Sequence, residues 1–114
     1  MRTASKPPAA HKEFVRRFPK LGQAWELVNE EGRQGPLDAK TQRLVKLAIG
    51  IGALREGAVH SGVRKARDAG ASLVEIEQLV ALGASTIGFP ATVAVWTWIR
   101  DSGEKGAAAR RRRR

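Results

Sequence analysis

The sequence contains no cysteine among its 114 residues. This absence excludes disulfides, thiolate nucleophiles and cysteine-ligated zinc sites. The sequence also lacks a long apolar run: none approaches the ~18–20 residues that are needed to cross a bilayer. The first residues, MRTASKPPAAHK, contain none of the apolar core of a secretory signal. We therefore expect a cytoplasmic protein with no membrane association.

Two further kinds of pattern are missing. No segment shows convincing period-two alternation, which would predict strands. No Gly-rich phosphate loop, G-x-S-x-G motif or H-E-x-x-H motif is present. A chain of this length forms one domain, and 42% of its residues are apolar, an ordinary share for a globular protein. The sequence therefore predicts a single all-α domain.

Positive charge is plentiful, with a net charge of +10, but it is concentrated at the two ends of the chain. Residues 13–105 carry thirteen Lys/Arg and eleven Asp/Glu, whereas Arg110–Arg114 are five consecutive arginines. We expect a disordered leader over residues 1–10, a helical domain over 11–101 and a basic disordered tail over 102–114. Such a tail is either merely solvated or binds anionic surfaces weakly and non-specifically. No basic recognition helix of the kind that reads DNA is evident.

Apolar residues recur at three- and four-residue steps along most of the chain, which is the helical period. Pro19 separates the first two helices, because proline disfavours a helical conformation in the residue before it. The sequence predicts about five to six helices, packed in an orthogonal or bundle-like way, over residues 12–17, 19–32, 39–54, 56–69, 73–84 and 90–100.

Turn and capping residues mark the ends of the later helices. Asp38 is a favourable N-cap for the helix that follows it. Gly70 suits the left-handed residue that ends a helix. Ser72 and Glu75 form the S-x-x-E pattern of a capping box, and Pro90 suits the first turn of the last helix.

The helices over 39–54 and 90–100 are apolar on more than one face. Gly50 and Gly52 each weaken the first of them by roughly 1 kcal/mol, and we expect them to allow close approach by a neighbouring helix. A domain of this size cannot easily enclose two such helices. The surplus apolar surface, including Trp96 and Trp98, favours a helix-mediated homo-oligomer. The alternative is that the first two helices cover it.

The densest polar cluster beside the apolar segments is REGAVHSG, residues 55–62. Glu56 and His60 lie four residues apart, hence on one face of a helix. A carboxylate in that position orients an imidazole and prepares it as a general base. The alternative is an ordinary surface pair. The two side chains would give a metal only two ligands, and His11 lies in the leader, so we expect no metal and no other cofactor.

Residues 37–91 resemble the carboxymuconolactone decarboxylase superfamily, which includes the alkylhydroperoxidase D proteins. The resemblance rests on several features in order: K-T-x-x-L, a buried aliphatic helix, a polar site, a basic helix, A-G-A-S, a capped helix and G-F-P-A. Upstream, FPKLGQAWELVNEEGRQGPL resembles the lead-in of short single-domain members. The resemblance implies an all-α fold and assembly into trimers or hexamers through helix packing.

The peroxidase branch of this superfamily resembles a Glu…C-x-x-C-x-x-x-H pattern, in which the second cysteine attacks the peroxide. Arg55 and Ala58 stand where the two cysteines would fall, and Gly62 stands where the histidine would be. The resemblance therefore implies that this chain is not a thiol peroxidase.

The decarboxylase branch resembles R-E-H-E-x-x-x-H, of which this chain keeps the opening Arg55 and Glu56. The stretch E-G-A-V-H-S is similar to that of a subgroup often written E-G-A-V-H-S-H. Gly62 departs from this subgroup by the loss of a histidine. The resemblance then implies Glu56, His60 and Ser61 as the subgroup's site.

Three functions follow as hypotheses. In the first, Glu56 orients His60, which moves a proton on a small carboxylated substrate. Ser61 then donates a hydrogen bond, and Arg55 or Arg64 holds the carboxylate. In the second, the chain is a non-catalytic oligomeric module that binds a ligand or a partner on the same scaffold. In the third, the arginine tail binds nucleic acid or an acidic surface.

Overall fold

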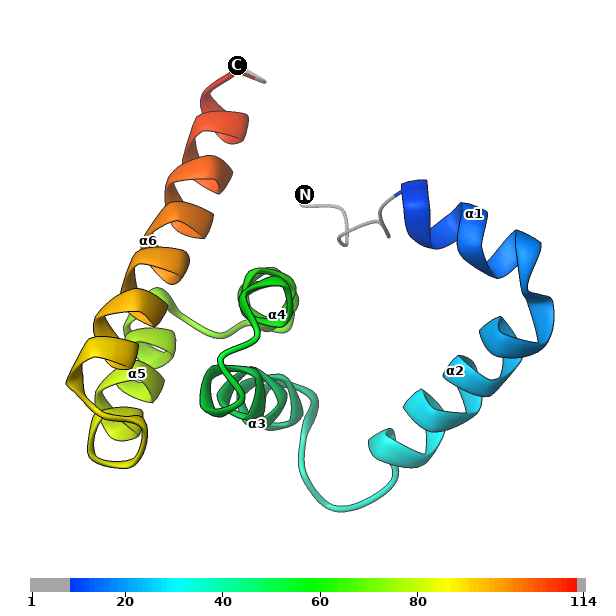
Figure 1. Ribbon diagram of the computed structural model, residues 1–114, viewed down its shortest axis with the longest axis horizontal. Helices are drawn as coiled ribbons and strands as arrows, with labels where there is room; N and C mark the ends of the chain where they lie inside the picture. Colours follow the sequence, from blue (N-terminus) through cyan, green and yellow to red (C-terminus); the bar gives the residue numbers. More distant parts are fainter. Residues whose placement is uncertain (1–8, 113–114) are drawn as a thin grey trace. The chain divides into compact units, whose positions relative to one another are not determined.

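The computed structural model describes the backbone of residues 9–112 and the side chains of residues 9–102. Within that range the chain forms six helices and no strand (Figure 1), which confirms the predicted all-α fold. The chain divides into two compact units, Met1–Leu37 and Asp38–Arg114. The helices are α1 Ala9–Arg17, α2 Pro19–Arg33, α3 Ala39–Gly52, α4 Glu56–Asp68, α5 Leu73–Ile87 and α6 Phe89–Arg112.

The first unit consists of α1 and α2, which meet at Phe18. Pro19 occupies the first turn of α2 as predicted, and the ring centroids of Phe14 and Phe18 lie 5.0 Å apart. A Cβ added to Gly22 would lie 3.1 Å from the Cβ of Val15, so the two helices approach each other closely there. Neither helix contains a buried residue. The apolar side chains of this unit are therefore only partly covered; Trp25, for example, is half exposed.

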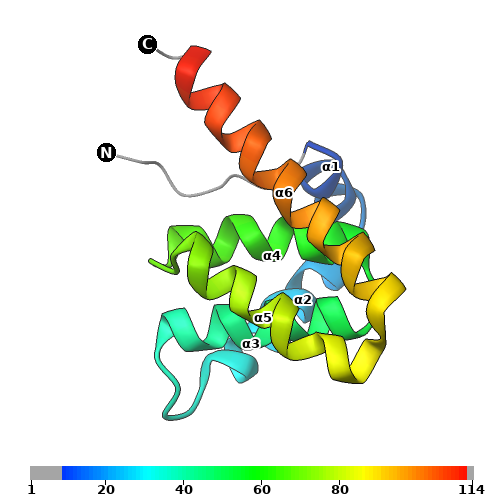
Figure 2. The ribbon, with the colours of Figure 1, turned by 90° about the vertical axis from the view of Figure 1, so that its left-hand side faces the viewer.

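The second unit holds the core. In it, α3 packs against α4 and α5, and α6 packs against α4 and α5. Seen end-on in Figure 1 and from the side in Figure 2, α3 and α4 lie side by side. The buried side chains come from all four helices and from the turn before α5: Leu47, Ile51, Val59, Val63, Ala66, Ala71, Ile76, Val80, Val95 and Ile99.

The contact between α3 and α4 depends on two glycines. A Cβ on Gly62 would lie 3.0 Å from Leu47 Cδ1 and 3.4 Å from Leu47 Cα, closer than ordinary van der Waals contact. A Cβ on Gly50 would lie 3.4 Å from the Cβ of Ala58. The close approach predicted for Gly50 is therefore confirmed. The same prediction for Gly52 is wrong, because nothing lies within 4 Å of the Cβ position there.

The predicted capping residues of α3 and α5 are confirmed. Asp38 Oδ1 accepts a hydrogen bond of 2.8 Å from the Thr41 N–H. Ser72 Oγ accepts one of 3.0 Å from the Glu75 N–H, and Glu75 Oε1 accepts one of 2.8 Å from the Ser72 N–H. Gly70 has a φ of +98°, as expected for a left-handed residue after a helix.

Glu75 also links the starts of α5 and α3, because its Oε2 lies 2.9 Å from Lys40 Nζ. The hydrogen bond from the Ser72 backbone, and then the one from Lys40, hold the pKa of Glu75 below its ordinary value of 4.5. A carboxyl group with a lowered pKa stabilises the fold above its ordinary pKa. This contribution is lost as the pH falls through the lower, folded value.

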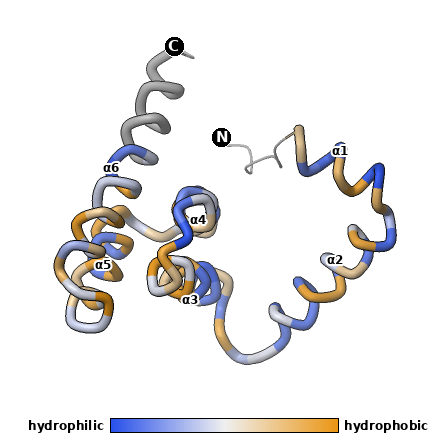
Figure 3. Tube along the Cα trace, in the orientation of Figure 1, coloured by the Kyte–Doolittle hydropathy of each residue, from blue (hydrophilic) through white to orange (hydrophobic). Residues whose placement is uncertain are grey.

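Two expectations about the apolar helices are corrected. The second half of the helix over 39–54 is apolar on more than one face, which is typical of a buried central helix, but Ile49 in that half is 66% exposed. The last helix was expected to end near Arg100, but α6 continues to Arg112. No proline follows Pro90, and the alanines at 107–109 are strong helix formers. Figure 3 shows hydrophobic stretches in α5 and in the first half of α6.

The predicted domain boundaries remain predictions. The leader over 1–10 and the domain over 11–101 do not coincide with the division after Leu37. Residues 1–8 and 113–114 lie outside the described residues. In the described part of the chain, no helix has both the length and the hydropathy to span a membrane.

The two glycines of α4 should respond in opposite ways to alanine. Gly57 has open space at its Cβ position, so Gly57→Ala should raise the free energy of unfolding by up to about 1 kcal/mol through helix propensity. Gly62→Ala gains the same propensity but overpacks the contact with Leu47, which costs about 1–3 kcal/mol. We therefore expect Gly62→Ala to be less stable than the unmodified protein. Urea unfolding followed by tryptophan fluorescence measures both, and equal stabilisation by the two variants would contradict the close packing.

Candidate functional site

The turn between α3 and α4 brings the polar cluster of residues 55–62 to the start of a helix. Leu54 has a φ of +54°, a left-handed conformation that costs a non-glycine residue about 1–2 kcal/mol. The N–H groups of Leu54 and Arg55 donate to the carbonyls of Ile51 and Gly50, at 3.0 and 3.1 Å. The chain therefore reverses within a few residues. Glu56 becomes the first residue of α4, where a carboxylate interacts favourably with the helix dipole.

Glu56 and His60 form the pair that their spacing predicts. Glu56 Oε2 lies 3.2 Å from His60 Nε2. The two side chains differ in exposure, with 59% of Glu56 and 30% of His60 accessible to solvent. The imidazole is thus partly enclosed, whereas the carboxylate lies at the surface of the chain.

A third residue, Ser102 of α6, completes this arrangement. Its Oγ lies 2.5 Å from His60 Nδ1, on the opposite side of the ring from Glu56. The same hydroxyl donates a hydrogen bond of 2.9 Å to the carbonyl of Trp98, one turn earlier in α6. His60 therefore links α4 to α6, through a contact between two residues that lie 42 positions apart in sequence.

The sequence did not indicate Ser102, because it was assigned to the tail. The one available signal was the four-residue spacing of Trp98 and Ser102. If the last helix had been predicted to continue past Arg100, this spacing would have placed both residues on one face of it.

The hydrogen bonds around His60 define its proton positions. The Ser102 hydroxyl has one hydrogen, which it donates to Trp98, so its oxygen accepts the Nδ1–H of His60. A neutral imidazole then presents the lone pair of Nε2 beside Glu56. An imidazolium donates at both nitrogens, to Ser102 and to Glu56. The two ring nitrogens therefore have different surroundings: Nδ1 faces the Ser102 hydroxyl, and Nε2 faces the Glu56 carboxylate.

The other predicted site residues lie on α4 but are not bonded to this pair. Across residues 9–102, no hydrogen bond or ion pair joins Ser61, Arg55 or Arg64 to Glu56 or His60. Arg55 is the exposed residue before the first turn of α4. Arg64 lies one turn beyond His60, with its Nε buried and without a hydrogen-bond partner. Ser61 is half-buried.

Gly62 lies on a different face of α4 from His60. Two residues along a helix correspond to a rotation of about 200°, so position 62 faces Leu47 of α3 whereas His60 faces Ser102 of α6. A side chain at position 62 would therefore start toward α3, away from Glu56 and Ser102.

Metal-binding side chains do not gather elsewhere in the described part of the chain. Within it, no group of three or more His, Cys, Asp and Glu side chains lies close enough to hold a metal ion. The chemistry available at this site is that of a carboxylate, an imidazole and hydroxyl groups.

A family of known proteins matches most of this chain. The model of the carboxymuconolactone decarboxylase family matches residues 19–101, a range that includes Glu56 and His60 but ends one residue before Ser102. No curated protein and no solved structure gave a match.

The position of the His60 proton can be tested through Ser102. Ser102→Ala removes the acceptor of the Nδ1–H bond and leaves the pair with Glu56. We expect the nitrogen-15 resonance of Nδ1 to shift and the unfolding free energy to fall by about 1 kcal/mol. Ser61→Ala, a matched loss of a hydroxyl on the adjacent residue, should leave the ring resonances in place. An unchanged Nδ1 resonance in Ser102→Ala would contradict the bond between the two helices.

Proposed function

Because the chain belongs to the carboxymuconolactone decarboxylase family, whose model matches residues 19–101, we propose that it transfers a proton on a small carboxylated substrate through Glu56 and His60. The observation that carries this proposal is the position of His60 between Glu56 and Ser102. An imidazole fixed at one nitrogen and paired with a carboxylate at the other is prepared as a general base.

In the proposed reaction, each group has a separate role. Ser102 accepts the Nδ1–H and so fixes the tautomer in which Nε2 carries a lone pair. Nε2 takes a proton from the substrate, and Glu56 stabilises the imidazolium that forms. The same proton then returns to carbon or oxygen of the product, so the pair ends in its initial state.

The proposed binding groups for the substrate carboxylate lie at the two ends of the pair. Arg64 follows His60 by one turn of α4, and its Nε has no hydrogen-bond partner within residues 9–102. Arg55 precedes Glu56 and is exposed. An arginine binds a carboxylate through two parallel hydrogen bonds. Ser61 is proposed as a further hydrogen-bond donor to the substrate.

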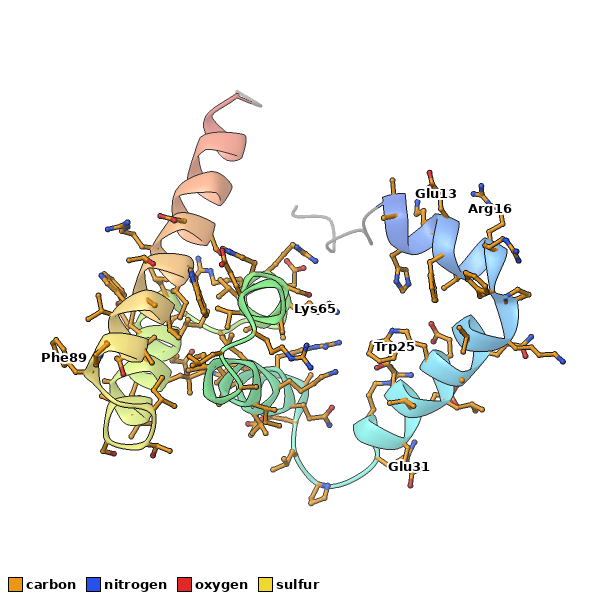
Figure 4. The ribbon with its side chains drawn as sticks, viewed as in Figure 1. Glu13, Arg16, Trp25, Glu31, Lys65 and Phe89 are labelled. Carbon is orange, nitrogen blue, oxygen red and sulfur yellow. The ribbon has the colours of Figure 1, made fainter. Side chains whose placement is uncertain are left out.

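A homo-oligomer, proposed as a trimer or hexamer, would enclose this site. Phe89, Val93 and Trp96 follow the helical spacing on α6 and are 76%, 45% and 39% exposed. Leu82 of α5 is 65% exposed. Phe89 points away from the other helices of its unit (Figure 4). Exposed apolar side chains in such a stripe are typical of a helix interface.

A second candidate function is a non-catalytic oligomeric module that binds a ligand or partner on the same scaffold. The exposure of 59% of the Glu56 side chain favours it, since a catalytic carboxylate usually lies in a cleft that excludes water. We also propose a cytoplasmic location and weak, non-specific anion binding through Arg110–Arg114.

Replacing His60 tests the proposed reaction. With carboxymuconolactone as the first probe, suggested by the family's name, we expect His60→Gln to lower kcat by about 10²–10⁴-fold, the usual contribution of a general base. Glutamine keeps polar atoms in the side chain but cannot carry the proton. Size-exclusion chromatography should give the same mass for both proteins. Unchanged turnover would remove His60 from the mechanism, and no turnover by the unmodified protein would favour the binding module.

Replacing Phe89 tests the oligomer. An acidic residue at the start of α6 is favourable to the helix dipole, so Phe89→Asp should disrupt the interface without disrupting the fold. Light scattering should change from three or six times the chain mass of 12.4 kDa to a smaller assembly. Val74→Asp, at an equally exposed position in the first turn of α5, is the matched control. An oligomer that persists in Phe89→Asp would exclude the α6 stripe as the interface.

A further inference from the structure

Four basic side chains gather where α3 and α4 run side by side. Arg43 and Lys46 lie three residues apart on α3, and Arg64 and Lys65 are adjacent on α4. The tight contact of Gly62 with Leu47 brings the two helices together at this level. We call these four residues the α3–α4 basic cluster. Lys65 leaves α4 on the side away from α5 and α6 (Figure 4).

The acidic residue nearest to this cluster in sequence is Asp68, one turn after Arg64 on α4. Within residues 9–102, no ion pair joins any of its four members to a carboxylate. Lys40, also on α3, is by contrast paired with Glu75 of α5 at 2.9 Å. Arg64 contributes an Nε that is buried and has no hydrogen-bond partner in this part of the chain. A buried N–H group without an acceptor is unfavourable, and a bound anion would supply that acceptor.

The pKa of Lys65 reflects the same excess of positive charge. Partial burial of its ammonium group lowers the pKa of Lys65, and the positive charges of Arg43, Lys46 and Arg64 lower it further. A group whose charged form is disfavoured in the folded chain weakens the fold at neutral pH. An anion placed among the four side chains would reverse this effect.

We propose that the α3–α4 basic cluster binds a phosphate group. A phosphate group has several acceptor oxygens and up to two negative charges, so donors from two helices can contact it at once. A carboxylate has one charge and two oxygens, which a single arginine satisfies. The site shares Arg64 with the proposed substrate-binding groups, but it goes beyond the proposed proton transfer, because Lys65 lies beside Arg43 and Lys46 of α3 whereas His60 faces α6.

Thermal unfolding of the full chain with added inorganic phosphate tests this proposal. Sodium chloride at the same ionic strength separates binding from screening. We expect a rise in Tm with phosphate concentration beyond that in chloride, since a ligand of the folded state stabilises it. Lys65→Gln and Arg43→Gln should each weaken phosphate binding about tenfold, the loss typical of one hydrogen bond to a charged group.

Two controls make the result specific. Arg67→Gln removes the same charge from α4, but Arg67 donates to the Ala71 carbonyl and lies outside the cluster, so phosphate binding should persist. His60→Gln should also leave phosphate binding intact, even if it abolishes turnover. All variants keep Arg110–Arg114, so any binding by those arginines is common to them.

The outcomes that would overturn the proposal are distinct. Equal stabilisation by chloride and phosphate would reduce the effect to screening. Equal losses in Lys65→Gln and Arg67→Gln would show that net charge alone matters. Stabilisation by acetate as strong as that by phosphate would assign the cluster to carboxylates.

Discussion

The contact between Gly62 and Leu47 determines how closely α3 and α4 approach, and both groups of polar side chains depend on it. On one side of α4, the contact brings Lys65 beside Arg43 and Lys46. On the opposite side, it leaves His60 directed at α6, where Ser102 holds the ring. The apolar contact between Gly62 and Leu47 thus influences the surroundings of both the α3–α4 basic cluster and His60.

Much of the fold could be predicted from the sequence, because the signals are local. The capping box of Ser72 and Glu75 and the N-cap at Asp38 depend on hydrogen bonds that span three residues. The end of α6 was missed because no residue terminates it: the chain after Arg100 contains neither proline nor a strong cap. Local composition therefore predicts the first residue of such a helix better than its last residue.

The candidate site was predicted only where it is local. Glu56 and His60 are neighbours by helical periodicity, and the distance of 3.2 Å follows from it. Ser102 could not be found in this way, because its contact with His60 depends on how α6 packs against α4. The basic cluster was missed for the same reason, since its charges become neighbours only when α3 and α4 pair. Pairing of distant segments carries no signature in a single sequence.

The packing at Gly62 also restricts the paths by which such a site can change. In this chain, a Cβ at position 62 would lie 3.0 Å from Leu47 Cδ1, so a side chain there requires Leu47 to shift. A smaller residue at position 47 would leave more room at position 62 but would lose core packing, because Leu47 is fully buried. The residue at position 62 and the residue at position 47 are therefore coupled: a substitution at one changes what the other position can accommodate.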